Sequence, residues 1–166
     1  MSTAADRTYT TTVGSQELEL PLVALSDELT IALLITVDLG VAFAETAGRE
    51  LAELMRPEQP EIIVSVATMG IPLAIEASRA LGVDDYVILH KTPKIHLGET
   101  WAEPVYSITT DTPQRLRMDP ARVDAVRGRR VAVVGQALDD IGRGGLRDPQ
   151  GFQHEARLQL PFDRRE

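Results

Sequence analysis

Apolar residues recur at three- and four-residue steps after Asp38 and outline one face of a helix. Pro57 and Pro60 interrupt the repeat, so the helix is expected to end near Arg56. The repeating positions are Ala44, Ala47, Leu51, Leu54 and Met55. The pattern predicts a first helix with a single buried face.

A short β-branched run and a second helical repeat follow. Residues 61–66, with the sequence EIIVSV, predict a buried parallel strand because nearly all of their side chains are apolar. Residues 67–70 are a small-residue turn. Residues 71–81 then repeat apolar positions along one face, carry a proline in the first turn and stop at Gly82. The segment predicts a strand, a tight turn and a helix in succession.

Two further apolar runs predict the rest of a parallel sheet. Residues 86–89 (YVIL) complete a β-α-β unit, whose crossover is expected to be right-handed. Residues 131–134 (VAVV) are wholly apolar, which predicts a central strand. Ligands of open α/β sheets collect at the carboxyl ends of the strands, so residues 67–70 and 135–145 are the informative loops.

The connecting segments predict a lid with a hairpin. Residues 90–104 are polar, contain prolines and a glycine, and are long for a structureless connection, which favours a functional lid. Residues 105–110 and 114–118 predict an antiparallel hairpin around a turn at residues 111–113. Beyond residue 145 no amphipathic helix followed by an apolar strand is evident, so the C-terminal part of the sheet looks incomplete.

Length and composition predict one domain over residues 1–166, with a flexible segment at 1–15 and an atypical tail at 136–166. No apolar run approaches the roughly 20 residues that span a bilayer, and no signal sequence is recognisable, which predicts a cytoplasmic protein without a membrane partner. The chain has no cysteine, so disulfides and thiolate metal sites are excluded. Any metal would need oxygen or histidine ligands, and Mg²⁺ suits such a composition best.

The charge distribution is uneven. The net charge is −8, which argues against a general nucleic-acid binder. Between Arg115 and Arg130 there are 6 arginines against two aspartates, and we interpret this stretch as a solvated polar face.

The order of these segments resembles the adenine phosphoribosyltransferases of the type I phosphoribosyltransferase class. The likeness spans residues 27–134 and includes the strand and turn at 61–70, the residues Lys91-Thr-Pro-Lys94, the polar lid and the hairpin. It implies a parallel sheet flanked by helices, and an enzyme of purine salvage. That enzyme would transfer 5-phosphoribosyl from phosphoribosyl diphosphate (PRPP) to a purine base, with adenine expected, and release pyrophosphate. Mg²⁺ and a homodimer are implied as well.

The resemblance also implies roles for single residues. In the family the first turn binds pyrophosphate through backbone amides, and a basic residue after the next strand lies against the diphosphate. Residues 98–103 (GETWAE) resemble the family's lid stretch Arg-Glu-Thr-x-x-Glu, with glycine in place of arginine. Its first glutamate would assist the proton of the purine. The implied catalytic residues are Glu99 and Lys91, and the implied substrate-binding residues of these segments are Ala67, Thr68, Met69, Gly70 and Lys94.

The family's hallmark is an apolar strand that runs directly into two acidic residues, followed by small residues, Thr-Gly, one residue and Thr or Ser. Here four residues, 135–138, separate Val134 from the acids, and the loop lacks the hydroxyl residues. In the family the acids bind the ribose hydroxyls, and the loop holds the 5′-phosphate at a helix N-terminus. The corresponding implied substrate-binding residues are Asp139, Asp140, Gly142, Arg143 and Gly144.

Three alternatives stay open. The altered loop and the lost C-terminal elements favour a non-catalytic relative that binds a nucleotide, a base or a partner chain. An orotate-type transferase would keep the reaction and change the base, because base choice depends on pocket shape. The third alternative is a generic doubly wound domain without any nucleotide role, with which the fold alone is equally compatible.

Overall fold

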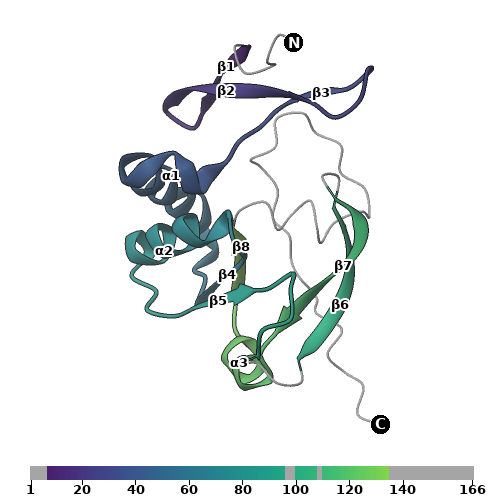
Figure 1. Cartoon of the computed structure of the whole chain (residues 1–166). Coiled ribbons are helices and arrows are strands. Elements are labelled where there is room, and N and C mark those ends of the chain that lie inside the picture. The colour runs from purple at the N-terminus through teal and green to yellow at the C-terminus, as the bar shows by residue number, and fades with distance from the viewer. Residues whose placement is uncertain (1–6, 96–99, 108–109, 135–166) are drawn as a thin grey trace.

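The computed structural model describes residues 7–95, 100–107 and 110–134 (Figure 1). Their secondary structure combines an antiparallel sheet at the N-terminal end, a parallel sheet with helices, and an antiparallel hairpin. The elements are β1 (Thr8–Val13), β2 (Gln16–Ala24), β3 (Thr30–Ala32), η2 (Thr36–Asp38), α1 (Gly40–Met55), η3 (Arg56–Glu58), β4 (Ile62–Val66), α2 (Gly70–Leu81), β5 (Tyr86–Leu89), β6 (Trp101–Ser107), β7 (Thr110–Met118), α3 (Pro120–Val126) and β8 (Val131–Val134).

The parallel sheet confirms the α/β prediction. β4 pairs in parallel with β5 on one side and with β8 on the other, in the order β5-β4-β8. The expectation that β8 is central is therefore wrong for the sheet that the structure describes, in which β4 holds the middle position. β8 is wholly apolar because other elements pack against both of its faces. Packing on both faces does not require that a strand pairs with each edge of β8.

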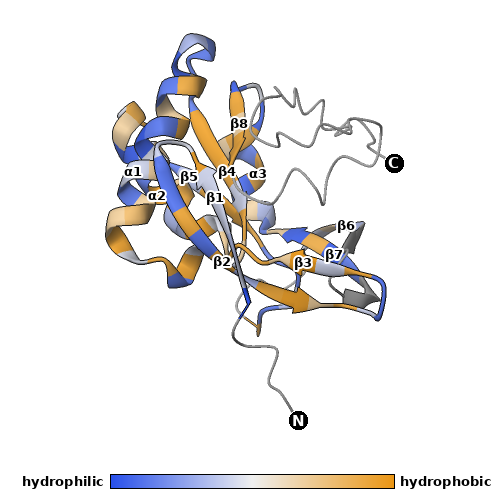
Figure 2. Cartoon of the chain, turned by 90° about the horizontal axis from the view of Figure 1, so that it is seen from above, coloured by the Kyte–Doolittle hydropathy of each residue, from blue (hydrophilic) through white to orange (hydrophobic). Residues whose placement is uncertain are grey.

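The sheet separates two apolar layers. Ile63 and Val134 pack with Phe43 and Leu73, on the face covered by α1 and α2. Ile62 and Val64 face the other way and pack with β7 and α3, through residues that include Met118, Val123 and Val126. Figure 2 shows the apolar strands β4 and β8 between the elements that cover them. Both faces are buried, which explains the continuous apolar runs of the sequence.

The N-terminal segment forms a sheet of its own. β1 pairs antiparallel with β2 from Thr8 to Val13, and β2 pairs with β3. Residues 8–13, part of the segment expected to be flexible, thus form a paired strand. The physical reason is a tertiary contact that the local composition does not reveal. The Glu50 carboxylate of α1 accepts hydrogen bonds from the Ser15 amide at 3.2 and 3.1 Å and so fixes the β1–β2 turn.

The predicted hairpin is present, and its second strand begins earlier in the chain than predicted. β6 and β7 pair antiparallel from Trp101↔Met118 to Ser107↔Thr110, so residues 111–113 belong to β7 and not to the turn. β6 begins at Trp101, which shortens the connection after β5 to residues 90–100. Pro113 and Pro104 lie within strands of a two-stranded sheet, where an edge position tolerates the missing amide hydrogen.

Helices α1 and α2 cross at a glycine. A Cβ atom built on Gly48 would lie 2.4 Å from the Glu76 Cβ and 2.9 Å from the Ala77 backbone nitrogen. Near the end of α1, the Arg56 guanidinium donates to the Ala80 carbonyl oxygen at 3.2 Å and also binds Glu53. The hydrogen bond that Arg56 donates to Glu53, together with the positive charge of Arg56, lowers the pKa of the Glu53 carboxyl. None of the helices in the described residues is long and apolar enough to cross a membrane.

The substitution Gly48→Ala tests this close crossing. Alanine in a helix interior ordinarily stabilises relative to glycine by about 0.5–1 kcal/mol. Here the added methyl group meets α2, so we expect a destabilisation of about 1–3 kcal/mol in urea unfolding. The control is Arg49→Ala, whose exposed side chain should change the free energy of unfolding by less than about 0.5 kcal/mol. If the Gly48→Ala protein is as stable as the wild type or more stable, the close contact between α1 and α2 at Gly48 is contradicted.

Candidate functional site

The carboxyl ends of the parallel strands meet at one edge of the sheet. Val66 is paired with Leu89, and Ser65 is paired with Val134, so the loops after β4, β5 and β8 all begin at this edge. The Ala67 amide donates to the Leu89 carbonyl oxygen at 2.8 Å, which keeps the first turn beside the end of β5. We call this place, defined by residues 67–70 and 90–94, the carboxyl edge.

Residues 67–70 form a tight turn that leads directly into α2. The Ile71 amide donates to the Thr68 carbonyl oxygen at 3.2 Å, and the Ala67–Thr68 peptide bond is cis. Met69 occupies the N-cap position, and its side chain makes no capping hydrogen bond. Thr68 is exposed, and the 12-residue helix α2 places its positive end at the turn. Backbone amides at a helix N-terminus are a common anion-binding arrangement.

A buried hydroxyl group packs against the turn on its interior side. Ser65 is fully buried in β4, and its Oγ donates to the Val134 carbonyl oxygen at 2.5 Å, across the ends of β4 and β8. A Cβ atom built on Gly70 would lie 1.9 Å from the Ser65 Oγ and 3.3 Å from the Val134 carbonyl oxygen. Close packing therefore favours glycine at position 70, which lets α2 begin directly on top of the strand ends.

A second hydroxyl group reaches the turn from the N-terminal part of the chain. Thr36 of η2 is buried, and its Oγ1 donates to the Met69 carbonyl oxygen at 2.5 Å. This bond fixes the peptide unit that joins Met69 to Gly70, and with it the direction of the Gly70 amide. Sequence reasoning missed Thr36 because 33 residues separate it from Met69. Ser65 carried a faint signal, as the single hydroxyl residue in an otherwise aliphatic strand.

The two predicted lysines follow β5 at the same edge. The backbone of His90 exchanges two hydrogen bonds of 2.9 Å with the backbone of Arg117, so the start of this loop is held against β7. Lys91 is half-buried and Lys94 is exposed. The lysine loop therefore begins beside the turn at residues 67–70. The other predicted site residues lie outside the described residues, namely Glu99, Asp139, Asp140, Gly142, Arg143 and Gly144.

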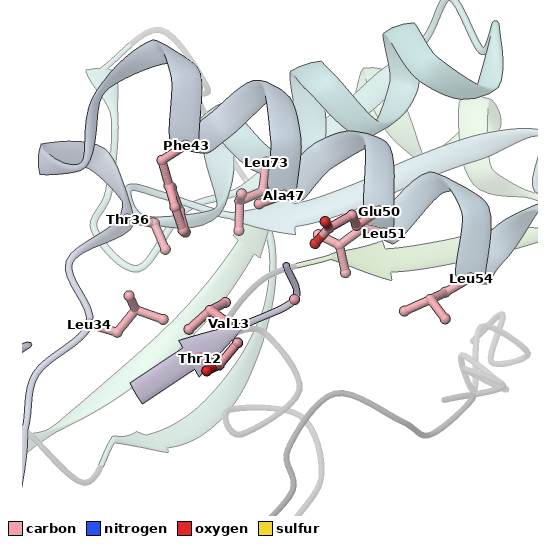
Figure 3. Close-up of a pocket in the computed structure, with 11 residues that line it drawn as sticks. Thr12, Val13, Leu34, Thr36, Phe43, Ala47, Glu50, Leu51, Leu54 and Leu73 are labelled. Carbon is pink, nitrogen blue, oxygen red and sulfur yellow. The ribbon is translucent and has the colours of Figure 1, made fainter. Parts of the chain in front are cut away.

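A cavity of about 250 Å³ lies elsewhere, between β1 and helix α1 (Figure 3). Most of its wall is apolar, and Glu50 and Thr36 are among its polar residues. The sequence-predicted site residues do not line it. Through Thr36, the cavity wall touches the carbonyl group of Met69, but the cavity itself is separate from the loops of the carboxyl edge.

Within the described residues, no group of three or more His, Asp or Glu side chains is placed to hold a metal ion. This observation does not test the expectation of Mg²⁺, because Asp139 and Asp140 lie outside the described ranges.

Comparison with known proteins gives one informative likeness. No known family description matches the chain. The chain is 28% identical over 128 residues to an amidophosphoribosyltransferase of Synechococcus elongatus, and the match covers 72% of this chain. It covers 24% of that protein, so the chain spans about a quarter of the length of this relative. The parallel sheet flanked by helices is consistent with a phosphoribosyltransferase-like fold. The likeness supports this broad class and does not test whether adenine is the substrate.

A double-mutant cycle tests the packing beneath the turn. Gly70→Ala should destabilise the protein by about 1–3 kcal/mol, because the new methyl group would overlap the Ser65 hydroxyl. Ser65→Ala removes that hydroxyl and its hydrogen bond, at a cost of about 1 kcal/mol. We expect the double variant to be more stable than the sum of the single effects predicts, measured by chemical denaturation. Strictly additive effects would show that Ser65 and Gly70 do not share this contact.

Proposed function

We propose that the chain acts as a phosphoribosyltransferase that uses PRPP, with the carboxyl edge as its diphosphate site. The observation that carries the proposal is the turn at residues 67–70, where backbone amides at the start of α2 lie beside the loop that carries Lys91 and Lys94. Fixed amides and a helix N-terminus favour a polyanion, and lysines add mobile positive charge. The likeness to an amidophosphoribosyltransferase supports the same class.

The proposed mechanism relies on electrostatic stabilisation of the leaving group. The bond between the ribose C1 and the diphosphate oxygen breaks, pyrophosphate departs with the electron pair, and a nitrogen of the acceptor forms the new bond to C1. The turn amides and Lys91 would stabilise the negative charge that grows on pyrophosphate in the transition state. Because this charge is larger in the transition state than in the bound substrate, the same contacts would accelerate the reaction.

We take the acceptor to be a purine base, with adenine as the first candidate, on the basis of the family resemblance. Glu99 would take part in the proton transfer of the base. Mg²⁺ would enter together with the diphosphate of PRPP, since this ion retains water ligands and is commonly held through substrate phosphates. When bound, it neutralises part of the phosphate charge. The homodimer and the cytoplasmic location stay predictions.

A non-catalytic relative is the second candidate. The observation that favours it is the loop after Val134, where the acids stand four residues later than in the family pattern. Such a protein would bind PRPP or pyrophosphate at the carboxyl edge without transferring the phosphoribosyl group.

The experiment measures pyrophosphate release from PRPP and Mg²⁺ with adenine, hypoxanthine, xanthine or orotate in turn. We expect turnover with a purine, and a loss of at least about tenfold in kcat/KM for PRPP in the double variant Lys91→Ala, Lys94→Ala, equivalent to about 1.4 kcal/mol. Arg49→Ala, which removes one exposed positive charge from α1, serves as the charge control and should keep full activity.

PRPP binding by calorimetry separates the two candidates. Binding without turnover by the correctly folded protein identifies the non-catalytic relative. Failure to bind PRPP and pyrophosphate at all would contradict both candidates.

A further inference from the structure

The cavity between β1 and α1 has an apolar floor and an exposed rim (Figure 3). Its floor includes Phe43, Ala47 and Leu73, which are buried in the apolar layer that α1 and α2 cover. Its rim includes Leu54, which is 57% exposed, and Thr12, which is exposed as well. A small molecule can therefore reach the apolar floor from solvent.

One charged group is found among the described residues that line the cavity, the carboxylate of Glu50. Figure 3 shows that Phe43, Ala47 and Glu50 all extend from α1 toward β1. Leu54 continues this row, because its members follow one another at steps of three or four residues along the helix. The face of a helix that lies against the core usually carries apolar residues. The negative charge therefore interrupts an otherwise apolar row.

The hydrogen bonds of Glu50 explain why an acceptor is needed at this position, and they do not explain the charge. Both carboxylate oxygens accept from the single amide of Ser15. A glutamine at position 50 would offer an oxygen to this amide without any charge. A carboxylate has about four acceptor positions, so Glu50 keeps room for another donor. No positively charged side chain of the described residues forms an ion pair with Glu50.

The size of the cavity and its one charge together define a ligand. An apolar cavity of about 150 Å³ holds a benzene molecule. The cavity beside α1 has about 250 Å³, which leaves room for an aromatic ring with a short chain. Sites for small ligands combine apolar walls with a few polar groups that fix the orientation. We propose that the cavity binds a small organic cation, with its apolar body against Phe43 and Leu73 and its ammonium group at the Glu50 carboxylate. This site is separate from the carboxyl edge, and the inference does not rest on the proposed function.

The test compares two ligands of nearly equal shape, the cation 2-phenylethylamine and the neutral 2-phenylethanol, at neutral pH. Each is titrated into the ¹⁵N-labelled protein, and the backbone amide shifts give the dissociation constant. We expect the shifts to centre on Leu51, Leu54 and the β1–β2 turn at Gly14. The amine should bind about tenfold more tightly than the alcohol, as for a hydrogen bond to a charged group. Saturating pyrophosphate should leave the affinity for the amine unchanged, because the carboxyl edge is a different site.

Two variants isolate the charge of Glu50. Glu50→Gln keeps an oxygen for the Ser15 amide and removes the charge, so it should bind the amine and the alcohol equally. Leu54→Lys adds an ammonium group one helical turn after Glu50, in the orientation that favours an ion pair, and should lose the preference for the amine through competition. Leu54 is largely exposed, so the urea midpoint of this variant should stay unchanged. The control is Glu45→Gln, which removes an exposed charge from the same helix and should keep both affinities.

The outcomes are distinct. A preference for the amine that is lost in Glu50→Gln and in Leu54→Lys, and kept in Glu45→Gln, sustains the inference. Equal affinities of the wild type for the two ligands overturn it, and so does a failure of both to bind, since another part of the chain or a second copy would then fill the cavity. An equal loss in Glu50→Gln and Glu45→Gln also overturns it, because the amine would then respond to the overall negative charge. None of these readouts requires PRPP or turnover, so failure of the proposed function is recognised separately.

Discussion

The hydrogen bond from the Ser65 hydroxyl to the Val134 carbonyl oxygen is the constraint on which the carboxyl edge depends. It joins the penultimate residue of β4 to the last residue of β8 in a region from which water is excluded, where a satisfied hydrogen bond is strong and an unsatisfied one is costly. Because the hydroxyl group fills the space directly under Gly70, a side chain at the first residue of α2 would overlap it. One buried hydroxyl thus sets the strand ends, the turn and the start of the helix relative to one another.

The same edge is held from two more directions. Thr36 binds the carbonyl group of Met69 from the N-terminal part of the chain, and Arg117 binds the backbone of His90 from the hairpin. These contacts bring together segments that are far apart in sequence, and each fixes a peptide group at the start of a loop. A backbone that is fixed before a ligand arrives loses little conformational entropy on binding. This arrangement suits an anion site whose donors are main-chain amides.

Local sequence patterns predicted the parallel sheet and its helices well, for a physical reason. Residues 61–66, 71–81 and 86–89 carry unbroken periodicities, because burial on both faces of a sheet or on one face of a helix constrains every position. The β1–β2 pairing was missed, and the turn between these strands is held by Glu50, 35 residues away from Ser15. The middle position of β4 was missed as well. An apolar sequence indicates that both faces of a strand are covered, and it does not indicate how many strands pair with it. At the carboxyl edge, the positions of the turn at 67–70 and of the loop that carries Lys91 could be predicted, whereas the contact of Thr36 with the turn becomes visible only when the topology is known.

The most direct test of the central claim is a titration of the ¹⁵N-labelled protein with pyrophosphate and Mg²⁺, followed by backbone amide chemical shifts. We expect the largest shift changes at Thr68, Met69, Gly70 and Ile71, with smaller changes in the loop of Lys91. Saturable shifts centred instead on the arginines between residues 115 and 130, or no saturable shifts in the folded protein, would contradict the assignment of an anion site to the carboxyl edge.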